Sequence, residues 1–373
     1  SVAIGSNALG ACTVGTDNIA IGDDTLLLNT TGVDNVAIGG DALTTATVGI
    51  NNIAIGKNTL TLLTTGNDNV AIGQGALDAA TTAIDNVAIG SNALGANTVG
   101  TDNIAIGDDS LLLNTTGINN VAIGGDALDA NTIGTGNIAI GKNALGANTT
   151  GIDNVAIGKD AMLVSTIGTD NVAIGTTALD ANTTGIRNVA IGVSALTGNT
   201  VGTRNVAIGT AALGANTTGV DNVAIGGLDA LDANTIGTGN VAIGTNALGA
   251  NTTGVDNVAI GVDTLLLNTV GINNIAIGNT SLNALTTATR CIAIGQDALG
   301  GVTTGVDNVA IGDAAGNTIT TGDGNTLIGR NAQTGSATAI DRIILSAGAG
   351  NGTADAANTA ITIGNDARAI RCD

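Results

Sequence analysis

The sequence predicts an all-β protein, a parallel β-solenoid of about 22 coils of 17 residues, and three observations lead to this fold class. The tetrapeptide Val/Ile-Ala-Ile-Gly recurs at 17-residue steps, its Val and Ile alternate with Ala as in a short strand, and Gly supplies 58 of the 373 residues. Seventeen residues leave no room for a helix beside a strand, and frequent Gly disfavours helical hairpins. Each repeat is therefore expected to form one coil stacked on the last.

The repeat runs through almost the whole chain. Its Gly falls at Gly5 and at every seventeenth residue up to Gly226, and after one step of 18 it resumes at Gly244. We expect Leu228 or a neighbour to bulge out of its coil, so that later side chains keep their facing. The repeats weaken after residue 312. The sequence therefore predicts a regular shaft at 1–312 and degenerate repeats, a shaft end or junction, at 313–373, within one elongated domain.

Stacking predicts ladders of identical side chains. Equivalent residues of neighbouring coils should lie about 4.8 Å apart, as hydrogen-bonded strands do. Asn precedes most strands and can hydrogen-bond along the stack, and a Leu four residues after the repeat Gly can form an apolar ladder. Representative positions are Asn35, Asn52 and Asn69 in the first ladder and Leu43, Leu60 and Leu77 in the second.

The middle Ala of the strand predicts an interface. If Val and Ile point into the coil, Ala points outward. Solvent alone would accept Thr, Lys or Ser there, so an Ala in the first 19 copies suggests close packing against a second copy of the chain; recent duplication is the alternative. A thin solenoid would gain stability by sharing a second core. The predicted interface residues are Ala37, Ala71, Ala105, Ala156, Ala190, Ala224 and Ala259.

The last copies depart from this pattern. The Ala position becomes Leu327, Ile344 and Thr362, and the Leu position becomes Gly316 and Gln333. Because separate ladders change together, we expect a change in packing, with the coils splaying or adopting a wider contact between chains beyond residue 312.

Composition excludes most other functions. The chain has no His, no aromatic residue and three Cys, and all 30 acidic residues are Asp, so most catalytic constellations cannot be assembled and no enzyme is predicted. Ten basic residues and a net charge of −20 argue against nucleic acid. The apolar runs are too short for membrane insertion. Cys12, Cys291 and Cys372 are expected to be free thiols or interchain bridges.

Two columns of polar residues remain as candidate sites. Asp23 with Asp24, and Asp108 with Asp109, are weak Ca²⁺ candidates, since the ion wants six to eight oxygens and solvated turns explain the same residues. No other cofactor is expected. In the strand-flanking Asp column, Arg187 and Arg204 sit between Asp170 and Asp221, which predicts local ion pairs.

The string Asn-Val-Ala-Ile-Gly, a polar pair and Ala-Leu resembles the YadA-like head repeat of trimeric autotransporter adhesins and the repeats of phage tail fibres. The resemblance implies a left-handed β-roll, a side-by-side homotrimer and a role in adhesion or host attachment. It implies an extracellular, cell-surface or virion-surface location, with the chain itself and a host-surface receptor or matrix as partners. The alternatives are a self-assembling extracellular filament and a solenoid that binds Ca²⁺, ice or glycan on its lateral face.

Overall fold

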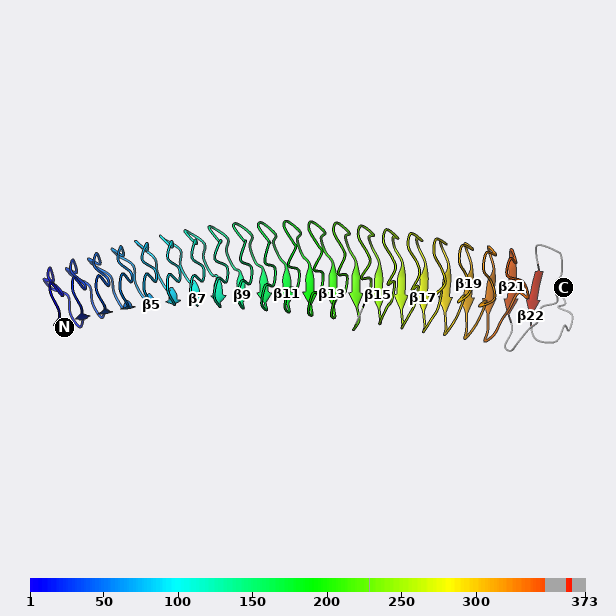
Figure 1. The fold of residues 1–373 in the computed structure, drawn as a ribbon, viewed down its shortest axis with the longest axis horizontal. Coiled ribbons are helices and arrows are strands. Elements are labelled where there is room, and N and C mark those ends of the chain that lie inside the picture. The colour runs from blue at the N-terminus through cyan, green and yellow to red at the C-terminus, as the bar shows by residue number, and fades with distance from the viewer. Residues whose placement is uncertain (228, 346–359, 364–373) are drawn as a thin grey trace, which may run out of the picture. The chain divides into compact units, whose positions relative to one another are not determined.

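The computed structural model describes residues 1–227 and 229–345 and the backbone of 360–363. These residues form an all-β parallel solenoid with a spacing of about 17 residues and no helix, which confirms the predicted fold class. About 20 of the strands belong to regular coils, slightly fewer than the 22 coils predicted. The chain divides into two compact units, Ser1–Arg187 and Asn188–Asp373. Figure 1 shows the short strands following one another in chain order within each unit.

Each coil contributes one short strand. The strands of the first unit are β1 (Val2–Ile4), β2 (Ile19–Ile21), β3 (Val36–Ile38), β4 (Ile53–Ile55), β5 (Val70–Ile72), β6 (Val87–Ile89), β7 (Ile104–Ile106), β8 (Val121–Ile123), β9 (Ile138–Ile140), β10 (Val155–Ile157) and β11 (Val172–Ile174). Those of the second unit are β12 (Val189–Ile191), β13 (Val206–Ile208), β14 (Val223–Ile225), β15 (Val241–Ile243), β16 (Val258–Ile260), β17 (Ile275–Ile277), β18 (Ile292–Ile294), β19 (Val309–Ile311), β20 (Thr326–Ile328), β21 (Arg342–Leu345) and β22 (Ala360–Ile363).

Within each unit every strand pairs in parallel with the next, and identical positions face one another. Ala156 of β10 pairs with Ala173 of β11, for example. Across the 18-residue step Val223 pairs with Val241, and Ala242 and Leu248 beyond it are fully buried, as in other coils. The predicted recovery of register and facing is confirmed. Leu228, the predicted bulge, lies outside the described residues.

The strands face the opposite way from the sequence prediction. The middle Ala has no exposed surface in any strand from β2 to β19, whereas the flanking Val and Ile lie half-buried or exposed on the outside. The alanines predicted to form an interface, Ala37, Ala71, Ala105, Ala156, Ala190, Ala224 and Ala259, are therefore buried inside their own coils. They cannot contact another chain, and that prediction is wrong.

The limited space inside the coil explains why Ala faces inward and Val and Ile face outward. The Leu ladder fills the centre: Leu43, Leu60 and Leu77 are fully buried, as predicted, and each has a positive φ near 50°, a costly conformation for a non-Gly residue. Neighbouring coils also stack closely, because a Cβ added at Gly134 would lie 2.5 Å from the carbonyl oxygen of Gly151, its equivalent in the next coil. With Leu in the centre, the strand has room for a methyl group and not for Val or Ile.

The end coils keep the same architecture. β20 pairs in parallel with both β19 and β21, and Leu327, at the Ala position, is fully buried. Ile344 of β21 is almost fully buried as well. The predicted splaying beyond residue 312 is therefore wrong for the described coils, since these larger residues point inward. The side chain of Thr362 lies outside the described residues.

Candidate functional site

The largest candidate site is an aliphatic band on the outer face of the strands. In every strand from β1 to β19 the first and third residues are Val or Ile, and they point away from the coil interior. We call these side chains the outer stripe. Both residues are exposed in β7, Ile104 by 38% and Ile106 by 37%, whereas in most strands one or both are half-buried. An uncharged aliphatic band that recurs in successive coils is the kind of surface that marks an interaction site.

The predicted Asn ladder holds the stripe in register. Asn154, just before β10, donates from Nδ2 to Asn137 Oδ1 of the preceding coil at 3.1 Å and to the Gly168 carbonyl at 2.7 Å. Its own Oδ1 accepts from the backbone N–H and Nδ2 of Asn171 in the next coil. Every polar atom of this buried amide is thus paired, as buried polar groups require. The ladder both closes each coil and joins it to its neighbours.

The ladder prediction holds for its named members. Asn52 donates from Nδ2 to Asn35 Oδ1, and Asn69 donates to Asn52 Oδ1, each at 3.0 Å. All three side chains are fully buried. The Asn ladder is therefore confirmed as a hydrogen-bonded structural element.

A second Asn ladder was not predicted. Asn114, Asn131 and Asn148 each donate from Nδ2 to the Asn of the preceding coil, at 2.9–3.0 Å. The ladder is interrupted at Ser165, where Ser165 Oγ and Asn148 Oδ1 are buried without a hydrogen-bond partner. The signal lay in the Asn of the Asn-Thr-Thr-Gly segments, which turn chemistry alone seemed to explain.

The Ca²⁺ candidates serve as acceptors between coils. Asp24 Oδ1 accepts from Asn7 Nδ2 at 2.8 Å, and Asp109 Oδ1 accepts from Asn92 Nδ2 at 2.9 Å. Their neighbours accept backbone N–H groups: Asp23 from Ser6 and Asp108 from Ser91. The two Asp pairs lie five coils apart and are not brought together. Among the described residues no group of three or more Cys or Asp is placed to hold a metal ion.

The charged column beside the strands pairs as predicted. Arg187 lies 3.6 Å from Asp170 in the first unit, and Arg204 makes a two-pronged contact with Asp221 in the second, at 2.6 and 2.8 Å. The hydrogen bond from Arg204 lowers the pKa of Asp221. Both groups are exposed, so these pairs contribute little to stability.

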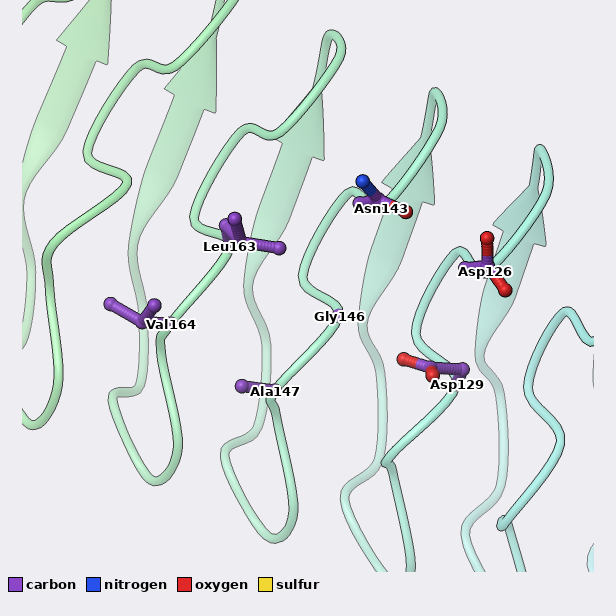
Figure 2. A pocket seen from close by; sticks show the side chains of 7 residues that line it. All are labelled: Asp126, Asp129, Asn143, Gly146, Ala147, Leu163 and Val164. Atoms are coloured by element: carbon purple, nitrogen blue, oxygen red, sulfur yellow. The ribbon is translucent and has the colours of Figure 1, made fainter.

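A shallow hollow of about 390 Å³ lies on another face of the first unit. Asp126, Asp129, Asn143, Gly146, Ala147, Leu163 and Val164 line it. Figure 2 shows that these residues come from three successive coils, with Gly146 in the middle coil and Asp129 and Leu163 on either side. Sequence reasoning missed this hollow, because its signal is a pattern with a period of three coils.

The described cysteines are free thiols. Cys12 is partly exposed, and Cys291 is buried in the Asn position before β18, where burial raises the pKa of its thiol to about 11. Its Sγ donates to the Gly305 carbonyl at 3.3 Å. Cys372 lies outside the described residues. The raised pKa of Cys291 is the opposite of the lowered thiol pKa that a reactive nucleophile needs.

The sequence was compared with protein-family models and with curated proteins. No protein-family model matches this sequence, and no curated protein matches it either. In the described part of the chain, no helix has the length and apolar character needed to cross a membrane.

Proposed function

We propose that this chain is a non-enzymatic structural and adhesive fibre shaft, exposed outside the cell or on a virion, that spaces or presents an attachment function. In this proposal the coils wind as a left-handed β-roll, and three copies pack side by side as a homotrimer. The partners are the chain itself and a host-surface receptor or matrix. The observation that supports self-association is the outer stripe.

The size of the stripe matches that of a protein interface. The first unit alone has eleven strands with two outward Val or Ile side chains each, which makes 22 residues. Stable protein interfaces use about 20–30 residues on each side. The buried core of such interfaces is depleted of charge, and the stripe carries none from β1 to β19. Packing the stripe against copies of itself would remove this surface from water.

The regular pitch favours a copy of the same chain as the partner. Each coil repeats Val or Ile at the same two positions, so the stripe is a series of ridges at the strand spacing of about 4.8 Å. A second solenoid with the same pitch can place its ridges between them over many coils. No strand contains an Asp in the part of the chain that the structure describes, so association through the stripe avoids bringing Asp side chains together.

The stripe can be tested with charged substitutions that leave the coil interior untouched. The double variant Val155→Lys/Ile157→Lys places two charges on the outer face of β10, and the control Thr150→Lys adds a charge at an exposed turn. Light scattering coupled to size exclusion should give a trimer for the unchanged chain and the control, and a monomer with unchanged circular dichroism for the double variant. A double variant that stays trimeric would exclude the stripe as the interface.

A further inference from the structure

One position of the coil repeats with a period of three coils. It is the residue directly after the buried Leu of the central ladder. Asp occupies it at Asp78, Asp129, Asp180 and Asp232, and Asn occupies it at Asn283. The steps are 51, 51, 52 and 51 residues, which is three coils each time once the extra residue in 226–231 is counted. We call this set the three-coil aspartates. The period indicates a structural unit longer than one coil.

The residues on neighbouring coils show what this unit does. The coil after Asp129 has Gly146 at the same position, and the coil after that has Leu163. A Cβ added at Gly146 would lie 3.4 Å from Leu163 Cδ1 and 3.5 Å from Asp129 Oδ1. Both side chains therefore lean over the space left by Gly (Figure 2). The carboxylate of Asp129 is thereby half-buried beside an aliphatic wall.

In the second unit the Gly and the Leu of this arrangement recur. Asp232 precedes Gly249, and a Cβ added at Gly249 would lie 3.4 Å from Leu266 Cδ1. Asp129, Asp180 and Asp232 are all half-buried, whereas Asp78 is exposed.

The charges around these carboxylates are of the same sign. Burial raises the pKa of Asp129, and the carboxylates of Asp126 in its own coil and Asp109 in the preceding coil raise it further, against a hydrogen bond from the Ala130 N–H. Burial likewise raises the pKa of Asp180 and of Asp232, helped by Asp160 and Asp229 respectively. No Lys or Arg contributes to any of these three shifts among the described residues.

We propose that the three half-buried members of this set, Asp129, Asp180 and Asp232, act as an acid-responsive device: as the pH falls they take up protons before ordinary exposed carboxyls do, and this uptake favours the folded solenoid. The proposal goes beyond the shaft function and does not depend on self-association.

The direction of the effect follows from proton linkage. A carboxyl whose pKa is raised by folding binds more protons in the folded state than in the unfolded state. This difference exists at pH values between the unfolded pKa of 3.8 and the raised folded pKa. Folding is therefore favoured by acidification through that window, and this gain is lost as the pH rises through the folded pKa. Protonation also removes like charge from a chain with a net charge of −20, which reduces self-repulsion.

The chain itself offers the substitution that tests the device. Asn283 shows that Asn fits the three-coil position. We compare the triple variant Asp129→Asn/Asp180→Asn/Asp232→Asn with the control Asp85→Asn/Asp153→Asn/Asp256→Asn. The control removes the same three charges from exposed turn positions with positive φ, which Asn also adopts readily.

Thermal unfolding of the full chain at pH 7 and about pH 5 gives the readout. The unchanged chain and the control should melt several degrees higher at the lower pH. The triple variant should melt higher than the unchanged chain at pH 7 and lose most of the rise on acidification. An unchanged chain whose melting temperature falls or stays constant on acidification would overturn the proposal. So would a control that loses the rise as completely as the triple variant.

Discussion

Regular and terminal coils of the second unit solve the same packing problem with different residues. In a regular coil, Leu196 fills the centre and the strand contributes only a methyl group. In the terminal coils, Gly316 stands at the Leu position and Leu327 at the strand position. A Cβ at Gly316 would lie 2.8 Å from Leu299 Cδ2 and 3.5 Å from Leu327 Cδ1, so neighbouring side chains occupy the space that Gly316 leaves.

The comparison shows that the coils keep the same volume of buried side chains, although the large side chain stands at different positions of the repeat. Ile319 adds to the same effect, since it is fully buried where regular coils have the second Asn ladder. The interior of a coil is closely packed, so any excess or deficit of side-chain volume is costly. The exchange of Ala for Leu at the end therefore marks a repacked interior and not a change of interface.

The largest expected effect comes from removing the central side chain in either region. Leu196→Ala and Leu327→Ala should each lower the free energy of unfolding by about 2–5 kcal/mol, because both leave a cavity. The control Leu267→Ala, at a side chain that is 48% exposed, should cost much less. Urea unfolding of the full chain measures all three. Equal midpoints for Leu327→Ala and Leu267→Ala would show that Leu327 does not replace the central Leu.

Adding a second large side chain to a regular coil should also destabilise it. Ala156→Leu places Leu beside Leu145 and Met162 in a full interior, at a cost of about 1–3 kcal/mol or more. The double variant Ala156→Leu/Leu145→Gly reproduces the spacing of Gly316 and Leu327, so it should recover part of that loss. A double-mutant cycle in urea measures the coupling. Additive losses would contradict the volume argument.

The Asn ladder can be tested by removing an Asn from one coil and by introducing an Asn into another. Asn154→Ala should cost about 1–3 kcal/mol, because it removes the side-chain donor of the Gly168 carbonyl and the acceptor of Asn171 Nδ2. In the second unit the same position is Cys291, whose backbone N–H bonds to Asn274 Oδ1. Cys291→Asn should add the missing amide and raise the melting temperature. A lower melting temperature for Cys291→Asn would show that the ladder is not continuous there.

The smallest effect is expected at the gap in the second ladder. Ser165→Asn should supply Asn148 Oδ1 with a donor and remove a buried unpaired hydroxyl, a gain of about 1 kcal/mol. Ser165→Ala serves as the matched control, because it removes the hydroxyl and leaves Asn148 unchanged. Thermal unfolding compares the two variants. If both change the melting temperature by the same amount, the gain does not come from the ladder.

Periodicity predicted most of the fold. The 17-residue step predicted parallel pairing, the recovery of register at Gly244 and the burial of the Asn and Leu ladders, because stacked coils place equivalent residues together. It could not decide which strand face is buried. An alternation with period two distinguishes two faces without naming the inner one. Hydrophobicity favoured Val and Ile, but the volume left by Leu, which adopts a positive φ, admits only Ala.

The candidate sites were harder to predict for a related reason. The outer stripe carries the residues that were first placed in the core, and the alanines were first placed at the interface. The three-coil aspartates escaped notice because their period exceeds one repeat, and a comparison of single copies averages it away. The half-buried environment of Asp129 depends on Gly146 and Leu163 in the next two coils, a contact that only the stacked structure shows.

The mass of the assembled particle tests the central claim most directly. Native mass spectrometry of the unmodified full chain at neutral pH should find a species of three times the 35.7 kDa chain mass, because in the proposed trimer two further copies cover the outer stripe. A particle that keeps the mass of one chain across the concentration range would contradict the account, since the stripe would then remain exposed to water.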